Sequence, residues 1–274
     1  MTPDSLFSLE GKTALVTGGA TGIGRMAAEA LVSAGARVLI VSRKGDACAA
    51  AAEEINRLQH PGTAEGFSGD VGSQEGIDAL AGEIEARCPD GLHILMNNAG
   101  RTWGAPLGRF PYLAWNKVMS LNVTGVFHLT QALLPLLRKT ASMDDPARVV
   151  NLASVMGEVP IGDGAYSYSA SKAAVIHMTK ILAVELAGEF ITVNALAPGP
   201  FLSKMTAFAV GEEDKAAKVA GDVPLKRLGR KEDIGGCMLF LCGPGGGYVT
   251  GAVIPVSGGI NVQVGSNIFE KAMD

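Results

Sequence analysis

Short runs of β-branched and other apolar residues alternate along this chain with longer, alanine-rich stretches that have the period of an α-helix. This alternation is typical of βαβ units, in which helices connect the strands of a buried parallel sheet. The expected strands span residues 12–17, 37–42, 64–67, 94–97, 149–153, 192–195 and 253–256. The expected helices span residues 22–34, 46–58, 73–87, 112–137, 166–186 and 231–241.

The alternation runs from residue 12 to residue 256 with no Ser/Pro-rich linker, low-complexity block or internal repeat. We therefore predict a single α/β domain over residues 1–274, built as one doubly wound, Rossmann-type parallel sheet with helices on both faces. Right-handed crossovers with a chain reversal after the third strand predict the order 3-2-1-4-5-6-7 and a ligand crevice at the carboxyl ends of strands one and four. Prolines and glycines between residues 200 and 224 flank a short amphipathic piece, residues 201–210, which is a candidate lid.

Composition and charge argue against several kinds of partner. The net charge of −4 and the lack of a long basic run speak against nucleic acid and anionic membranes. No apolar stretch reaches the roughly 18 residues of a membrane span, and no secretion signal is visible, so we expect a soluble cytoplasmic protein. The cysteines lack C-x-x-C spacing and nearby histidines, so we expect free thiols and no metal site: Cys48, Cys88, Cys237 and Cys242.

A glycine-rich turn, Thr17-Gly18-Gly19-Ala20-Thr21-Gly22-Ile23-Gly24, joins the first strand to a helix. Glycine permits a tight turn and close approach of a pyrophosphate, and the helix N-terminus offers N–H groups to the anion. The match to the dinucleotide fingerprint is weak alone, because an ordinary strand-to-helix turn would also use glycine. The candidate cofactor contacts here are Gly18, Thr21, Gly22, Ile23 and Gly24.

The end of the second strand indicates which nucleotide is bound. An NAD enzyme would place a carboxylate there for the ribose 2′-hydroxyl, whereas this chain has Ser42, Arg43 and Lys44. A guanidinium and an ammonium suit a 2′-phosphate, so NADP(H) is the expected cofactor. The alternative is that both cations are solvated loop residues. Asp70 and Val71, after the third strand, are candidates for contact with adenine, although an aspartate in a turn often caps a helix.

A second group of polar residues follows the later strands. Asn97-Asn98-Ala99-Gly100 ends the fourth strand, Ser154 follows the fifth, and Tyr168 precedes Lys172 by four residues. At this spacing a phenol and an ammonium lie on one helix face. A phenol ordinarily titrates near pH 10, and a nearby ammonium lowers its pKa, which suits proton transfer near neutral pH.

These motifs, with Asn122 and Pro198-Gly199, resemble the short-chain dehydrogenase/reductase superfamily in their order, and the resemblance covers nearly the whole chain. It implies a catalytic set in which Tyr168 donates a proton to the carbonyl oxygen and Ser154 stabilises that oxygen. It further implies that Lys172 binds the nicotinamide ribose and that Asn122 holds a water that leads to solvent. The implied cofactor contacts are Asn98, Ala99, Gly100, Tyr168, Lys172, Pro198 and Gly199.

Ordinary structural roles remain possible for each of these residues: a helix-boundary tyrosine, a locally bonded asparagine and a serine in a turn. Tyr166 has Ala170 at the position where a lysine would be needed, so we assign it to packing or to the substrate wall. The histidines have no catalytic arrangement around them: His60, His93, His128 and His177.

Within the superfamily the chain is most similar to 3-oxoacyl reductases of the type linked to rhamnolipid synthesis, which implies reduction of a ketone or 3-oxoacyl thioester. Relatives acting on acyl carrier protein commonly have a basic residue before the Ile-Thr-Val-Asn strand, where this chain has Glu189. The alternatives are a polyol or sugar-alcohol dehydrogenase and a nucleotide-binding sensor without turnover. The resemblance and the two long apolar helices also imply a homotetramer. The expected apolar substrate wall consists of Trp103, Met156, Val159, Pro160, Ile161, Phe201, Met205 and Phe208.

Overall fold

The computed structural model describes residues 2–161, 164–202 and 212–263. Within them, one parallel sheet has the order β3-β2-β1-β4-β5-β6-β7, as the sequence predicted. Its strands are β1 (Thr13–Thr17), β2 (Arg37–Ser42), β3 (Thr63–Ser68), β4 (Ile94–Asn97), β5 (Ala147–Leu152), β6 (Ile191–Pro198) and β7 (Val253–Val256). The chain order reverses between β1 and β4, so the crevice that the topology demands opens at the carboxyl ends of these two strands.

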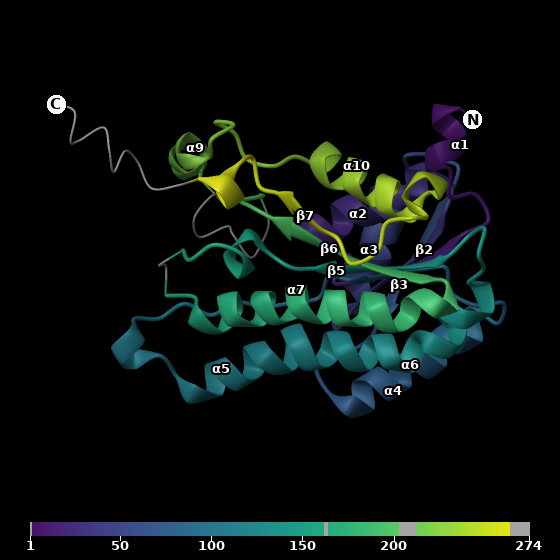
Figure 1. Cartoon of the computed structure of the whole chain (residues 1–274), viewed down its shortest axis with the longest axis horizontal. Helices are drawn as coiled ribbons and strands as arrows, with labels where there is room; N and C mark the ends of the chain where they lie inside the picture. The colour runs from purple at the N-terminus through teal and green to yellow at the C-terminus, as the bar shows by residue number, and fades with distance from the viewer. Residues whose placement is uncertain (1, 162–163, 203–211, 264–274) are drawn as a thin grey trace.

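Helices cover both faces of the sheet (Figure 1). One layer contains α2 (Gly22–Ser33), α3 (Gly45–Asn56) and α10 (Lys231–Cys242). The other contains α4 (Gln74–Arg87), α5 (Tyr112–Met119), α6 (Gly125–Thr140) and α7 (Tyr166–Leu186). Each layer packs its own group of fully buried aliphatic side chains against the sheet, so the central strands are buried on both sides and carry continuous apolar runs.

Most predicted helices and strands are correct to within a few residues, but the predicted helix over residues 112–137 is wrong as one continuous α-helix. It consists of α5 and α6 joined by a π-helical turn, Ser120–Thr124. Two short helices were not predicted, α1 (Pro3–Phe7) and α9 (Glu213–Asp222). Most of the candidate lid piece, residues 203–210, lies outside the described residues.

The cysteines are free thiols, and Cys48, Cys88 and Cys242 are buried. Among the residues that the model describes, no group of three or more His, Cys, Asp or Glu side chains is placed to hold a metal ion. None of the described helices has both the length and the apolar character needed to cross a membrane.

Candidate active site

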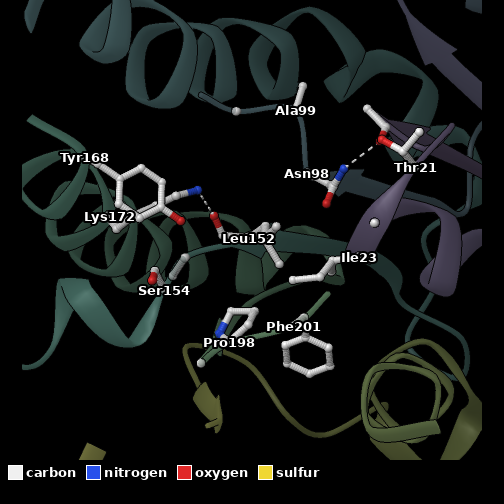
Figure 2. Close-up of a pocket in the computed structure, with 15 residues that line it drawn as sticks. Thr21, Ile23, Asn98, Ala99, Leu152, Ser154, Tyr168, Lys172, Pro198 and Phe201 are labelled. Atoms are coloured by element: carbon white, nitrogen blue, oxygen red, sulfur yellow. Dashed lines mark hydrogen bonds between the residues drawn. The ribbon is translucent and has the colours of Figure 1, made fainter. Parts of the chain in front are cut away.

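A pocket of about 260 Å³ opens at the carboxyl ends of β1, β4, β5 and β6 (Figure 2). The glycine-rich turn and the start of α2 form one end of it, and residues after β5 and on α7 form the other. Most of the lining residues are ones predicted from the sequence: Gly18, Thr21, Gly22, Ile23, Asn98, Ala99, Gly100, Ser154, Tyr168, Lys172, Pro198, Gly199 and Phe201. The two lining residues that were not predicted are Leu152, which ends β5, and Ala153, which follows it; their direction depends on the sheet and not on their own chemistry.

The glycine-rich turn is held by hydrogen bonds from the loop after β4. Asn98 Nδ2 donates to the carbonyl oxygens of Thr17 (2.7 Å) and Gly18 (3.1 Å). Gly18 has φ +65°, and Gly24 lies so close to Asn98 that a Cβ there would approach Nδ2 to 2.4 Å. Gly24 is absent from the lining of this pocket, and it packs at the contact between the start of α2 and the loop after β4.

Tyr168 and Lys172 share one face of the first turns of α7, with Lys172 Nζ 5.6 Å from the centre of the Tyr168 ring. Ser154 lies opposite them, where it caps a short 3-10 turn by accepting a hydrogen bond from the Met156 N–H (3.2 Å). Only 4% of Lys172 is exposed, and its ammonium donates to the Leu152 carbonyl oxygen. Burial lowers the pKa of Lys172 from 10.5 to about 8, so the group still carries its proton at neutral pH.

Asn122 lies behind the pocket in the π-helical turn, fully buried, and does not line the cavity. Its side-chain oxygen accepts from the Arg101 N–H (2.9 Å), and its Nδ2 donates to the Arg101 carbonyl (2.9 Å) and to Ser171 Oγ (3.0 Å). Ser171 in turn donates to the Tyr168 carbonyl (2.7 Å). The amide of Asn122 therefore connects the loop after β4 to the helical turn that carries Tyr168 and Lys172.

A second cavity of about 160 Å³ continues the crevice toward β2 and β3. It brings together four residues predicted from the sequence, Ser42, Arg43, Asp70 and Val71, and shares Gly18, Ala99 and Gly100 with the first pocket. Its other lining residues were not predicted as cofactor contacts: Thr17, Val41, Gly69 and Leu121. Arg43 is exposed, and no ion pair joins it to any residue in the described part of the chain.

Two predicted cofactor contacts at this end of the crevice, Lys44 and Asp70, differ in whether they line the cavity. Lys44 does not line the cavity; it is the residue before α3, and its N–H donates to Ser42 Oγ (3.2 Å). Asp70 does line it, and its Oδ1 accepts from the Gly72 N–H (2.9 Å). Asp70 does not cap α4, because Ser73 does so.

Among the described residues of the expected apolar wall, Phe201 alone lines the pocket. Trp103 and Ile161 are 45% and 40% exposed, and Met156, Val159 and Pro160 do not reach the cavity. Met205 and Phe208 lie outside the described residues. Tyr166 is also absent from the lining and packs edge-to-face on Phe110, with ring centres 5.8 Å apart.

Comparison with known proteins shows the family. A family model described as enoyl-(acyl carrier protein) reductase matches residues 18–261. The chain is 46% identical over 259 residues to the rhamnolipids biosynthesis 3-oxoacyl-[acyl-carrier-protein] reductase of Pseudomonas aeruginosa, covering 93% of this chain and 98% of that protein. It is 40% identical over 254 residues to the 3-oxoacyl-[acyl-carrier-protein] reductase FabG of Aquifex aeolicus, covering 93% and 99%.

Solved structures agree with this result. The Pseudomonas aeruginosa RhlG/NADP active-site complex superimposes with a TM-score of 0.90 at 44% identity, covering 96% of this chain and all of that one. A putative NAD(P)-dependent gluconate 5-dehydrogenase from Beutenbergia cavernae with bound NADP gives 0.83 at 34% identity, covering 93% and 98%. With the sheet order and the pocket described above, these similarities show that the chain belongs to the short-chain dehydrogenase/reductase family of oxidoreductases.

Proposed function

We propose that the protein is an NADPH-dependent reductase of ketones, with a 3-oxoacyl thioester as substrate. The observation that carries this proposal is the convergence of Ser154, Tyr168 and Lys172 in one pocket, whose other end is the glycine-rich turn. A site that only bound a nucleotide would not require a phenol beside a buried ammonium. The relatives named as 3-oxoacyl reductases support the same assignment.

The residues at the glycine end fit a dinucleotide. The N-terminus of α2 has no side-chain cap, so its first N–H groups are available to a pyrophosphate. A Cβ on Gly18 would lie 2.9 Å from Asn98 Nδ2, so only a glycine keeps this wall of the cradle open. Arg43 and Ser42 line the adenosine end without a carboxylate at the ribose position, which favours the 2′-phosphate of NADP(H). Relatives solved with NADP support this choice.

When bound, NADPH supplies the hydride that the carbonyl carbon accepts. In our proposal the Tyr168 hydroxyl donates its proton to the carbonyl oxygen, and Ser154 Oγ donates a hydrogen bond to that oxygen as negative charge develops. Lys172, held by the Leu152 carbonyl, places a positive charge beside the phenol and favours the phenolate left behind. A proton from solvent then restores the Tyr168 hydroxyl.

The structure changes how Asn122 would take part. Its side-chain amide already bonds Arg101 and Ser171, so we assign the side chain a positioning role for α7. Both hydrogen atoms of its Nδ2 are bonded, so this nitrogen has none left to donate to a water.

The alternative is a polyol or sugar-alcohol dehydrogenase, which the likeness to the structure described as a putative gluconate 5-dehydrogenase favours. The lining of the catalytic pocket argues for the acyl substrate, because Ile23, Leu152, Pro198 and Phe201 are apolar. Buried hydroxyls without partners cost about 1–3 kcal/mol each, whereas a buried methylene contributes about 0.8 kcal/mol.

A substrate series separates the two possibilities. NADPH oxidation is followed with 3-oxoacyl thioesters of increasing chain length, on coenzyme A and on acyl carrier protein, and NADP reduction with gluconate and sugar alcohols. We expect kcat/KM to climb with acyl length, by up to about fourfold per buried methylene. Both carboxylate oxygens of Glu189 bond the guanidinium of Arg138, so this position offers no free positive charge to an acidic carrier. We therefore expect kcat/KM to be the same for thioesters of coenzyme A and of acyl carrier protein. Preference for gluconate or a flat response to length would contradict the acyl assignment.

We also propose a homotetramer. The helices α5, α6 and α7 expose large apolar side chains on the face away from the sheet, including Leu113 (69% exposed) and Val184 (82%). Exposed apolar surface of this kind is typical of a subunit contact. Sedimentation equilibrium at micromolar concentration should give four times the chain mass, and a monomer would contradict the assignment.

A further inference from the structure

One glycine outside the catalytic pocket, Gly229, lies against a side chain that lines it. Phe201 follows β6, is 2% exposed, and lies between two cavities: the catalytic pocket and a smaller one of about 130 Å³. Gly229 lines the smaller cavity and is absent from the lining of the catalytic pocket. Figure 2 shows the ring beside Pro198 and below Ile23.

Gly229 contacts the ring so closely that no side chain fits between them. A Cβ built on Gly229 would lie 2.2 Å from Cζ, 2.3 Å from Cε1 and 2.5 Å from Cε2 of Phe201. The φ angle of Gly229 is outside the left-handed region, so its backbone conformation would accept alanine. The glycine is therefore required for space and not for backbone freedom.

The backbone on both sides of this contact is fixed. Gly229 N–H donates to the Pro200 carbonyl (3.0 Å), and Gly229 forms a β-bridge with Phe201. Two residues earlier, Arg227 makes a two-bonded fork with Asp233 (2.6 and 2.9 Å), which also accepts from the Arg230 N–H. Since these hydrogen bonds hold the chain in place, we expect an added methyl to displace the Phe201 ring, which also lines the catalytic pocket.

We infer that Gly229 is a positioning residue for cofactor binding: its missing side chain determines where the Phe201 ring lies beside the nicotinamide end of the site. This inference rests on the proposed function, because that function places the nicotinamide between Tyr168 and Pro198. The residue acts through Phe201 alone, so replacing the ring should remove the requirement for glycine.

The test uses four proteins: wild type, Gly229→Ala, Phe201→Leu and the double variant. Leucine lacks the three ring atoms that the new methyl would meet. Gly236→Ala is the matched control, because Gly236 lies on α10 with open space around its Cβ position. NADPH affinity is measured by fluorescence titration, kcat and KM with a 3-oxoacyl thioester, and the melting temperature by circular dichroism.

We expect Gly229→Ala to weaken NADPH binding by about tenfold or more, as overpacking of a filled site does. The double variant should bind NADPH as Phe201→Leu does, and Gly236→Ala should match wild type. If Gly229→Ala fails to fold, recovery of folding and NADPH binding in the double variant supports the same contact. Wild-type affinity in Gly229→Ala, or no recovery in the double variant, overturns the inference.

The proposed function is tested separately by the wild-type protein in the same experiment. If wild type binds no NADPH, the cofactor assignment fails. If wild type binds NADPH and the variants do not follow the pattern above, the cofactor assignment stands and the role of Gly229 fails.

Discussion

Replacing Lys172 with methionine should stop turnover and make the protein more stable at neutral pH. Lys172 is 4% exposed, and burial lowers its pKa from 10.5 to about 8. Holding the ammonium charged at pH 7 therefore costs roughly 3 kcal/mol relative to the unfolded chain. Methionine removes that cost but leaves the Leu152 carbonyl without its donor, which costs about 1 kcal/mol. We expect a net gain of about 1–2 kcal/mol in the free energy of unfolding.

The pH dependence distinguishes this explanation from better packing. A lysine with a lowered pKa in the folded state binds fewer protons there than in the unfolded state between pH 8 and 10.5. Wild-type stability should therefore rise with pH through this window, and the advantage of Lys172→Met should shrink by about 2 kcal/mol between pH 7 and 9.5. Urea unfolding at fixed protein concentration measures it, with exposed Lys180→Met on the same helix as control. A less stable Lys172→Met variant, or a difference that does not change with pH, would refute the reasoning.

Two further predictions concern the cofactor and a histidine at the amino-terminal ends of β1 and β4. Arg43→Ala should weaken NADPH binding by roughly 1.5–3 kcal/mol in calorimetric titration and leave NADH binding almost unchanged, because only NADPH carries a 2′-phosphate. Equal losses of affinity for the two cofactors would show that Arg43 does not bind the 2′-phosphate. His93 accepts a hydrogen bond from the Thr13 N–H (3.1 Å), and burial, with the nearby charge of Lys12, lowers its pKa from 6.5 to about 4. Between pH 6.5 and 4 the unfolded chain therefore binds a proton that the folded protein does not. The wild-type free energy of unfolding should fall as the pH is lowered from 7 to 5. After a discount for solvent screening, we expect this fall to be about 1 kcal/mol larger than in His93→Gln, measured by urea unfolding. Parallel stability curves for the two proteins would show that His93 is not responsible.

The sheet order was predictable because apolar runs too short for helices alternate with helical periods, and right-handed crossovers leave few topologies. The site was predictable because glycines, the Asn-Asn-Ala-Gly turn and the Tyr168–Lys172 pair all follow strand ends, which a parallel sheet brings to one edge. The residues that sequence patterns place at strand ends are therefore those that line the pocket.

The π-helical turn at Asn122 was not predictable, because the apolar period continues through residues 112–137 without a break. The turn is held by tertiary hydrogen bonds from Asn122 to Arg101 and Ser171, which no local pattern contains. The role of Gly229 was invisible for a similar reason. Its contact with Phe201 joins residues 28 positions apart, and the sequence shows only a glycine among other loop residues.

For the residues that the structure describes, the expected apolar wall was largely wrong as a description of the pocket, since Phe201 lines it and the other described members do not. Hydrophobic residues after Ser154 were assigned to the cavity because they follow a catalytic position in the sequence. In the structure Met156 lies within the 3-10 turn Val155–Gly157 and Val159 follows it; neither lines the cavity, and Ile161 is exposed. Proximity in sequence to a site residue does not place a side chain in the site when a turn intervenes.

The most direct test of the account is turnover by Tyr168→Phe. NADPH oxidation by the wild type and this variant is measured with a 3-oxoacyl thioester, and NADPH affinity is measured for both by fluorescence titration. Because the phenol hydroxyl acts on the reacting oxygen, we predict that kcat falls by about 10²–10⁴-fold while NADPH affinity stays within about twofold. A Tyr168→Phe variant that turns over the thioester at the wild-type rate would contradict the assignment of Tyr168 as the proton donor.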